Sequence, residues 1–397
     1  MNIFKKAFCR AYQFAFHIAL PVLPYREPKI LKNTEELTYE IKRNKYSVPL
    51  IITDEFLYQS GAVNDIEKSF SENGIKHIVY SNTRPNPTVE NVDEALKMYA
   101  RFGADSIIAF GGGSAIDCAK AVGARIAYKG KSLDRLKGDL RIMRKLPPLF
   151  AIPTTAGTGS EVTVTAVITD EKKKHKYTMN SFPLIPRYAV LDAKNTYTLP
   201  KHLTATTGMD ALTHAVEAYI GRSTSKETRK LSEEAVKLIF DNIETAYNEP
   251  ENYTARTNML SAAYKAGIAF SKSYVGYIHA IAHSLGGQYN VPHGLANSVI
   301  LPIMLEEYGE KIYKKLYKLA VCSGVAEKTD SIDIGARKFI KKVKELNFKM
   351  GIPEKISGIE EKDIKVMAKH ADKEGNPLYP VPVLMSRKEL ERIYYKI

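Results

Sequence analysis

Five side chains able to bind a transition metal lie between residues 210 and 293. Asp210 and His214 are four residues apart in GMDALTHAVEAY, and His279 and His283 have the same spacing in HAIAHSLGG, with His293 ten residues further on. On a helix, side chains four residues apart leave the same face one turn apart, so each pair can offer two ligands to one ion. Imidazoles with a carboxylate suit Fe(II) or Zn(II). The spacing predicts a metal site, but it leaves open which of His283 and His293 is a ligand.

The alternative for each of these histidines is an ordinary hydrogen-bonded place in the core. The chain holds nine His, and four of them occur in this stretch together with the carboxylate. Buried polar groups need partners, and one metal ion satisfies several of them at once. The constellation therefore favours the metal site, although a single His would not.

A glycine-rich loop, Gly111–Ser114, follows an expected strand and precedes a helix that starts in AIDCAK. Glycines let the backbone approach a diphosphate, and a helix N-terminus presents unpaired N–H groups. The dinucleotide fingerprint is incomplete because Ile116 holds the place of its third glycine. Ser114 and Asp117 also have the spacing of a helix cap, which is their non-functional interpretation. Alone, this loop is a weak indication of nucleotide binding.

A second loop, Pro153–Glu161 (PTTAGTGSE), follows another expected strand and supplies several hydroxyls and two glycines. Two such loops at strand ends of one α/β domain favour a dinucleotide there. Asp54 ends the first strand of that domain, where a carboxylate can accept hydrogen bonds from a ribose diol and repel a 2′-phosphate. Capping the next helix is an equally good role for Asp54.

Strands and helices alternate in the first half of the chain, which predicts a parallel sheet covered on both faces. The expected strands are 48–53, 76–80, 105–110, 148–153, 161–169, 176–180 and 188–192, and the expected helices are 62–72, one after Thr88 and one after Ser114. From about residue 203 the periodicity is almost only helical. We therefore predict an α/β Rossmann-like dinucleotide-binding domain in residues 1–200, including an N-terminal extension in 1–30, and an all-helical metal-binding domain in 201–397.

Charge and cysteine content narrow the class of protein. The chain has 397 residues and a formal net charge of +14 that is spread along its length. The tightest cluster, Lys172–Lys176, is typical of a solvated turn, and without a nucleic-acid motif we expect no nucleic-acid partner. Cys9, Cys118 and Cys322 are too far apart for a disulfide framework, which favours a reducing, cytoplasmic location.

The first 24 residues carry early positive charge and then an apolar stretch, which Gln13 and His17 interrupt. This stretch is too short and too polar to span a bilayer. No small-residue cleavage site follows it, so a signal peptide is the less favoured interpretation. We expect a helix that docks on the fold or on a partner subunit.

Four long motifs resemble the iron-containing (group III) alcohol dehydrogenase family: GGGSAIDCAK, PTTAGTGSEVT, GMDALTHAVEAY and HAIAHSLGGQYNVPHGLANSVILP. Their order and spacing match from about residue 30 to the C-terminus, where YPVPVLMSRKELE closes the resemblance. The resemblance implies a dehydroquinate synthase-like architecture with a nicotinamide cofactor in the cleft, NAD rather than NADP. It also implies one divalent metal on the helical side, Fe(II) or, as an alternative, Zn(II).

The resemblance also implies roles for individual residues. The implied metal ligands are Asp210, His214, His279 and His293, and the implied catalytic residue is His283, which would contact substrate or relay protons beside the nicotinamide. The implied cofactor-binding residues are Asp54, Asn86, Gly111, Gly112, Gly113, Ser114, Thr154, Thr155, Thr158 and Lys176. Of these, Asp54 matches the position that favours NAD over NADP in this family.

These features predict a metal-dependent alcohol dehydrogenase or aldehyde reductase that transfers a hydride between a small alcohol or aldehyde and NAD(P). A mostly apolar substrate is indicated by the residues around the metal motifs: Met209, Phe270, Tyr274, Tyr277, Ile278 and Leu285. Two alternatives stay open: a glycerol dehydrogenase- or dehydroquinate synthase-like metal enzyme, and a non-catalytic NAD-binding protein of the same fold. We expect no membrane span and a homo-oligomer, with a dimer favoured.

Overall fold

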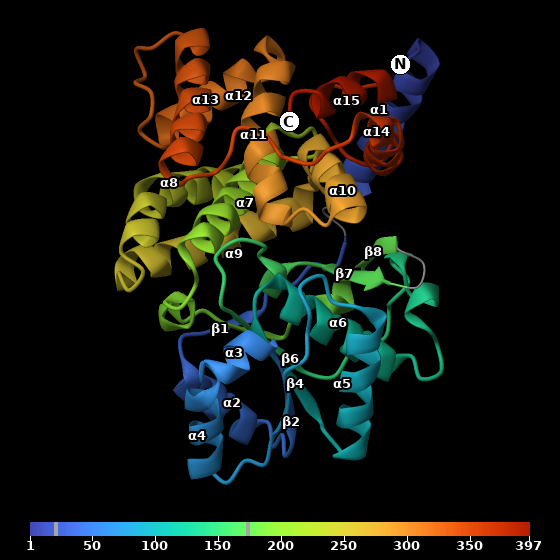
Figure 1. Cartoon of the computed structure of the whole chain (residues 1–397), viewed down its shortest axis with the longest axis vertical. Helices are drawn as coiled ribbons and strands as arrows, with labels where there is room; N and C mark the ends of the chain where they lie inside the picture. The colour runs from blue at the N-terminus through green and yellow to red at the C-terminus, as the bar shows by residue number, and fades with distance from the viewer. Residues whose placement is uncertain (20–22, 172–174) are drawn as a thin grey trace. The chain divides into compact units, whose positions relative to one another are not determined.

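The computed structural model (Figure 1) describes residues 1–19, 23–171 and 175–397, so Lys172, Lys173 and Lys174 of the lysine cluster lie outside the described residues. The chain forms two compact units. One is Pro24–Thr198, and the other is Leu199–Ile397 together with Met1–Leu23. The two units are described separately below.

The first unit is built on a six-stranded parallel sheet in the order β1-β9-β6-β4-β2-β3. Its strands are β1 (Lys29–Leu31), β2 (Pro49–Ile52), β3 (Ile78–Tyr80), β4 (Ser106–Gly111), β6 (Leu149–Pro153) and β9 (Tyr188–Val190). The chain adds β3 on one side of β2 and then returns to add β4 on the other side. The carboxyl ends of β2 and β4 therefore form the topological switch point, where open α/β sheets bind their ligands.

Helices cover both faces of this sheet, as the alternating pattern predicted. Every residue of β2 and β4 is buried, which is why these strands are continuous apolar runs. Ile107 and Ala109 face a core shared with α5 (Val89–Arg101) and α6 (Gly113–Ala127). The opposite face, including Ile108, is covered by the helices α2 (Thr34–Arg43), α3 (Glu55–Gln59) and α4 (Asn64–Glu72).

A small sheet, in the order β5-β8-β7, completes the first unit. Its strands are β5 (Gly138–Asp139), β7 (Thr165–Asp170) and β8 (His175–Asn180). The strand expected at 161–169 begins only at Thr165, because Gly159 has a left-handed φ of 61° and Ser160–Val162 form a 3-10 turn. Gly159 therefore ends the second glycine loop rather than opening a strand.

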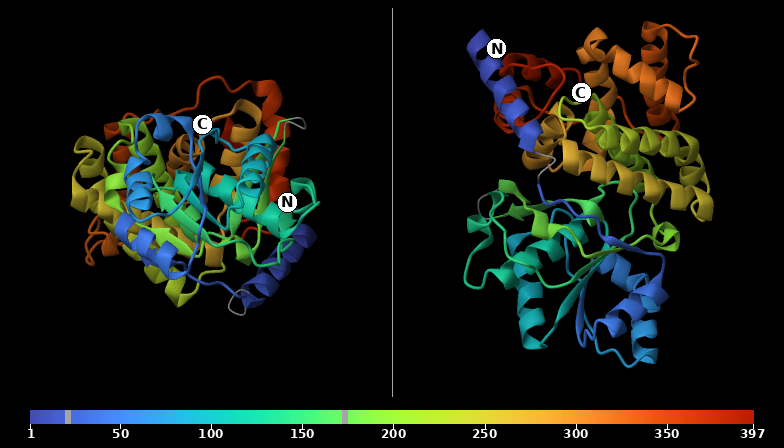
Figure 2. Two further views of the ribbon diagram at one scale, coloured as in Figure 1. Left: turned by 90° about the horizontal axis from the view of Figure 1, so that it is seen from below. Right: turned by 180° about the vertical axis from the view of Figure 1, so that it is seen from behind.

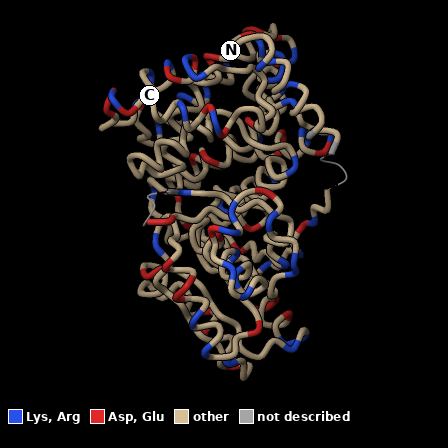
Figure 3. The backbone as a smooth tube through the Cα atoms, turned by 90° about the vertical axis from the view of Figure 1, so that its right-hand side faces the viewer, with Lys and Arg blue, Asp and Glu red and all other residues tan. Residues whose placement is uncertain are grey.

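The second unit is all-helical, as predicted. Its helices are α1 (Ile3–Ala19), α7 (Lys201–Ile220), α8 (Lys226–Asn248), α9 (Tyr253–Ser273), α10 (Tyr277–Tyr289), α11 (His293–Tyr308), α12 (Glu310–Cys322), α13 (Ile332–Lys349), α14 (Glu361–Gly375) and α15 (Arg387–Tyr394). Within the described residues, no helix is long and apolar enough to cross a membrane. Lys and Arg, as well as Asp and Glu, are scattered along the backbone (Figure 3), in keeping with a charge that is spread over the chain.

The placement of α1 differs from the expectation that grouped residues 1–30 with the α/β domain. Helix α1 belongs to the helical unit, where it lies beside α14 and α15 (Figures 1 and 2). Gln13 donates to the carbonyl oxygen of Tyr379, and Arg10 donates to that of Val381. These long-range hydrogen bonds are invisible to local periodicity, which is why the sequence did not assign the helix to its unit.

Candidate active site

Three helices bring one carboxylate and three imidazoles together in the helical unit. Asp210 and His214 project from α7, His279 from α10, and His293 is the first residue of α11. One ligand atom from each lies within 4.8 Å of all the others, and the side chains are buried except for that of His293, which is partly exposed. The i,i+4 pair of α7 thus reaches one point, as its spacing predicted.

The imidazole of His279 is held by a buried carboxylate that sequence reasoning missed. The Nδ1 atom of His279 lies 2.6 Å from Oε2 of Glu217, one turn after His214 on α7. Glu217 also accepts the backbone N–H groups of Gly276 and Ile278 at the start of α10. With Nδ1–H bound to the carboxylate, Nε2 of His279 carries its lone pair toward the cluster. The three-residue spacing from His214 was the signal that could have found Glu217.

The packing and the protonation of these side chains favour the binding of a cation. The ring of His214 stacks between Phe270 (4.2 Å between ring centroids) and His279 (4.6 Å). Burial, together with the neighbouring imidazoles, holds the pKa of His279 well below its usual range, so its ring is neutral and able to donate. Burial also raises the pKa of Glu217 to about 8, against the three hydrogen bonds it accepts, and a cation bound beside His279 would favour the ionised carboxylate.

The side-chain amide of Asn297 lies at the point where the candidate ligand atoms converge. Its Nδ2 atom donates to Oδ1 of Asp210 (2.7 Å) and lies 3.2 Å from Nε2 of His279 and 3.1 Å from Nε2 of His293. Three of the four candidate ligand atoms therefore point at one group of partial positive charge, as they would point at a metal ion. One carboxylate and three imidazoles fit Fe(II) or Zn(II).

His283 stands beside this cluster with different partners. Its ring stacks on that of His293, with centroids 5.1 Å apart. Its Nδ1 atom lies 2.6 Å from Oε1 of Glu374 on α14, and the hydroxyl of Tyr379 donates to the same oxygen at 2.7 Å. Among the described residues, His283 is not part of the group of converging ligand atoms. The geometry thus separates the two histidines that spacing left open.

The expected apolar surroundings of the metal motifs need correction. Met209, Tyr277, Ile278 and Leu285 are completely buried core residues, and the Tyr277 hydroxyl donates to Asn376. Phe270 and Tyr274 are partly exposed, and Phe270 stacks on His214. Helical periodicity cannot distinguish an apolar side chain of the core from one that faces a substrate, so only these two remain candidates for substrate contact.

The predicted cofactor residues gather at the switch point of the first unit. Gly111 is the last residue of β4, and Asp54 lies two residues after the end of β2. A Cβ added to Gly111 would lie 3.9 Å from the Oδ2 atom of Asp54. Asp54 caps α3 by accepting the backbone N–H of Leu57 at 2.9 Å. Asp54 therefore has the capping role, and its second carboxylate oxygen lies beside the glycine loop.

The two glycine loops pack directly on each other. A Cβ on Gly112 would lie 3.2 Å from Cγ2 of Thr155, and one on Gly113 would lie 2.8 Å from Cγ2 of Thr158. Real Cβ atoms do not approach closer than 3.0 Å, so a side chain at the third glycine would force Thr158 to move. At the second glycine, Thr155 would have to give by a few tenths of an ångström. The N–H of Thr154 donates to the carbonyl oxygen of Gly111, which continues the sheet into the loops.

The remaining predicted cofactor residues form one hydrogen-bonded group. Asn86, with a left-handed φ of 57°, donates its N–H to Oγ of Ser114 and accepts from Nζ of Lys176 at 2.8 Å. Ser114 therefore binds the turn before α5 and does not cap α6. The N-cap of α6 is Gly112, without a side-chain cap bond, so the first N–H groups of the helix are not covered by a capping side chain.

Ser114 and Asp117 therefore do not form the helix cap that was the non-functional interpretation of their spacing. Asp117 instead accepts hydrogen bonds from Oγ of Ser160 (2.7 Å) and the N–H of Val167 (3.0 Å). Lys120, one turn further on and completely buried, donates to the carbonyl oxygens of Thr163 and Thr165 at 3.0 and 2.7 Å. These two side chains fasten α6 to the segment that follows the second loop, and burial lowers the pKa of Lys120 to about 8.

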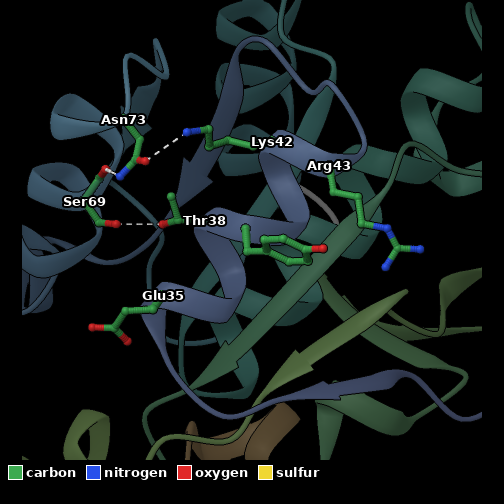
Figure 4. A pocket seen from close by; sticks show the side chains of 7 residues that line it. Glu35, Thr38, Lys42, Arg43, Ser69 and Asn73 are labelled. Atoms are coloured by element: carbon green, nitrogen blue, oxygen red, sulfur yellow. Dashed lines mark hydrogen bonds between the residues drawn. The ribbon is translucent and has the colours of Figure 1, made fainter.

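A shallow surface depression lies away from all these residues (Figure 4). It is lined by Glu35, Thr38, Tyr39, Lys42, Arg43, Ser69 and Asn73. Its polar groups bind one another: the hydroxyls of Thr38 and Ser69 are 2.7 Å apart, and Lys42 donates to Asn73. It contains no predicted site residue, and we assign it no role.

Comparison with known proteins decides the family. The model for iron-containing alcohol dehydrogenase matches residues 31–193, and the model for the C-terminal part of the Fe-containing alcohol dehydrogenase family matches residues 204–397. The chain belongs to the iron-containing alcohol dehydrogenase family. Alcohol dehydrogenase 4 of Saccharomyces cerevisiae is 36% identical over 341 residues, which are 85% of this chain and 87% of that protein.

Solved structures of similar proteins agree with this family and its fold. A crystal structure of 1,3-propanediol oxidoreductase superposes with a TM-score of 0.89 at 33% identity and covers 94% of this chain and 98% of its own. The sulfoacetaldehyde reductase of Bifidobacterium kashiwanohense, solved in complex with NAD+, gives a TM-score of 0.82 at 26% identity, with coverages of 94% and 97%. The predicted family, fold class and reaction class of this iron-containing alcohol dehydrogenase are thereby confirmed.

Proposed function

We propose that this protein interconverts a small alcohol and its aldehyde with a bound Fe(II) or Zn(II) ion and NAD, with NADP as the less favoured cofactor. Membership of the family makes the chain an alcohol or aldehyde oxidoreductase. Our proposal assigns the metal ligands, the proton-transfer residue and the cofactor-binding residues of this chain. The observation that supports it most strongly is the convergence of Asp210, His214, His279 and His293 within 4.8 Å of one another.

The metal, when bound, supplies a Lewis acid for the substrate oxygen, and NAD supplies the hydride acceptor. Asp210, His214, His279 and His293 would hold the ion. Glu217 fixes the ring of His279 in the tautomer that a ligand needs. Phe270 packs on His214 and keeps that ring in place.

His283 is the residue we assign to proton transfer. A carboxylate oxygen of Glu374 at 2.6 Å fixes the proton on Nδ1, which leaves Nε2 free of that proton and able to accept one. The alcohol must lose its hydroxyl proton when it is oxidised, and an imidazole with such a carboxylate partner is suited to receive it. In the reverse direction the same nitrogen returns the proton to the product oxygen.

Residues of the first unit would hold the dinucleotide. The loop Gly111–Ser114 and the start of α6 present N–H groups to a diphosphate. Hydroxyls from the second loop are added by Thr154, Thr155 and Thr158. The hydrogen-bonded pair of Asn86 and Lys176 completes the proposed cofactor site. Asp54 would accept from the adenosine ribose. The sulfoacetaldehyde reductase complex with NAD+ supports this choice of cofactor.

Location and assembly belong to the same proposal. The free cysteines Cys9, Cys118 and Cys322 suit a reducing, cytoplasmic compartment. We also propose a homo-oligomer, with a dimer favoured, which analytical ultracentrifugation of the full chain tests.

The proposal is tested by a screen of small alcohols and aldehydes with NAD and NADP in parallel, on protein of measured metal content. We expect absorbance of reduced nicotinamide to appear with an alcohol and to disappear with the matching aldehyde. A metal-dependent lyase of the same fold would consume its substrate without net reduction of the cofactor. Absence of net hydride transfer from every alcohol, in metal-loaded protein that binds NAD, contradicts the proposal.

A further inference from the structure

Helix α1 is attached to the helical unit by its polar face. Arg10 donates to the carbonyl oxygens of Val381 (2.7 Å) and Pro382 (2.9 Å). Gln13 donates to that of Tyr379 at 2.6 Å, and Cys9, one turn before Gln13, is buried on the same face. A surface helix normally buries its apolar stripe and exposes its polar one. Among the side chains of α1 that the structure describes, the arrangement is reversed.

The outward face of α1 is apolar and wide. Its large side chains are exposed by 44% (Tyr12) to 82% (Phe4), and they are Ile3, Phe4, Phe8, Tyr12, Phe14 and Ile18. Exposed alanines fill the positions between them, namely Ala7, Ala11 and Ala15. At about 100° per residue, all of these positions fall within one half of the helix circumference. A continuous apolar face of this kind marks an interaction surface.

The charge of this segment is of one sign. The first 26 residues contain Lys5, Lys6, Arg10 and Arg26 and no Asp or Glu. Lys6 is exposed, and Lys5, which is 48% exposed, reaches Asp372 at 3.3 Å. The segment precedes residue 31, where the match to the family model begins. Its composition is therefore not explained by the oxidoreductase fold.

We propose that α1 binds the surface of an anionic lipid bilayer, lying in the plane of the membrane. Its phenylalanines and isoleucines would enter the boundary between headgroups and acyl chains, and its lysines would lie at the level of the anionic headgroups. A basic helix whose apolar face is rich in Phe has the composition of such an interfacial helix. The helix does not cross the membrane, in agreement with the absence of a spanning helix among the described residues.

A second copy of the chain fits this face less well. Helix α1 offers no acidic side chain that could pair with the lysines of a second α1. The apolar face also covers about half of the circumference, whereas a two-stranded coiled coil uses the narrower stripe of its a and d positions. An anionic membrane surface fits both the positive charge of α1 and the width of its apolar face.

The experiment uses the full chain and vesicles of phosphatidylcholine with or without phosphatidylglycerol, separated by sedimentation. We expect binding to the anionic vesicles that weakens as salt rises. The triple variant Phe4→Ser, Phe8→Ser, Phe14→Ser should lower the partition coefficient at least about 100-fold, and Lys6→Glu should lower it about tenfold for anionic vesicles only. Phe348→Ser is the matched control, because Phe348 is 83% exposed on α13.

Far-UV circular dichroism and thermal unfolding establish that the variants are folded, and ultracentrifugation without lipid establishes their oligomeric state. Wild-type protein that stays in the supernatant with anionic vesicles overturns the proposal, and so does a folded triple variant that binds as well as wild type. If the triple variant instead loses an oligomer that wild type forms, and neither protein binds vesicles, the face belongs to a second copy and the proposal is wrong. None of these readings requires that the enzymatic activity be known.

Discussion

The Nδ1 atom of His279 on α10 and the Oε2 atom of Glu217 on α7 are 2.6 Å apart, and both side chains are buried. This contact joins the two helices that carry three of the four converging side chains. Because Glu217 also binds the N–H groups at the start of α10, it sets the position of the helix as well as the ring. Partners of this kind orient the ligands of a metal and tune its affinity.

Glu217→Gln should therefore weaken metal binding while the protein stays folded. The amide keeps the volume of the carboxylate but loses its charge, so the basicity of His279 falls. We expect an affinity for Zn(II) or Fe(II) about 10- to 100-fold lower, measured by competition with a chromophoric chelator. Glu374→Gln is the matched control, since Glu374 contacts His283, and it should leave metal affinity near that of wild type. Equal losses in both variants would refute a specific role for Glu217.

The two histidines left open by spacing should separate in metal content. His293→Ala should purify with little metal, because its Nε2 is one of the converging atoms. His283→Ala should keep most of the metal and lose turnover, because its partner is Glu374. Metal analysis of both variants after identical purification is the measurement. Equal metal loss would show that the ligands are assigned wrongly.

Removing the metal should abolish the reaction and spare the fold. The core of the helical unit is formed by apolar side chains of many helices, so the ion is not needed to close it. After chelation we expect an unchanged far-UV circular dichroism spectrum, retained NAD binding and no alcohol oxidation. Anaerobic addition of Fe(II) or Zn(II) should restore turnover at different rates. Unfolding of the apo protein, or full activity in it, would contradict a catalytic ion.

Asp54→Gly should improve the use of NADP relative to NAD. The change removes a carboxylate beside the glycine loop, and repulsion of a phosphate at a partly exposed site is worth about 1 to a few kcal/mol, which is about tenfold or more in selectivity. Asp54→Asn is the sharper variant, because it keeps a side-chain cap for α3 and removes only the charge. The ratio of kcat/KM for the two cofactors is the readout. A wild-type preference for NADP would leave Asp54 with the capping role alone.

Lys120→Met should lower the free energy of unfolding by about 3 kcal/mol, since it leaves the buried carbonyl oxygens of Thr163 and Thr165 without their donor. The loss should also depend on pH. The pKa of Lys120 is about 8 in the folded chain and 10.5 ordinarily, so between these values the unfolded chain binds more protons. The stability of wild type relative to the variant should therefore rise from pH 8 to 10.5. Urea unfolding at several pH values measures it, and a constant difference would mean that Lys120 does not titrate in this window.

The parts of the fold that depend on local pattern were predictable. The apolar run of β4, the helix that follows Thr88 and the i,i+4 pair of α7 all appear as expected. Partners from distant segments were not. Asp117 has cap spacing but binds β7 and Ser160, and Arg10 has no local sign of its contact with Val381.

The choice between His283 and His293 also depends on distant segments, because the position of α11 relative to α7 decides it. Only the family resemblance pointed to His293 in advance. Asn297 and Glu217 are different, since each is one helical turn from a recognised histidine. A search for further polar residues at that spacing would have found both.

The three helices that supply the converging side chains also determine when the protein can acquire its ion. Asp210 and His293 are far apart in sequence, and their contact exists only after α7, α10 and α11 have packed. A nascent chain in which these helices have not yet packed lacks the complete set of ligands, so we expect metallation to follow folding during biosynthesis. Iron starvation of the producing cell should thus yield a stored pool of inactive enzyme, ready for activation when iron returns, rather than a degraded one.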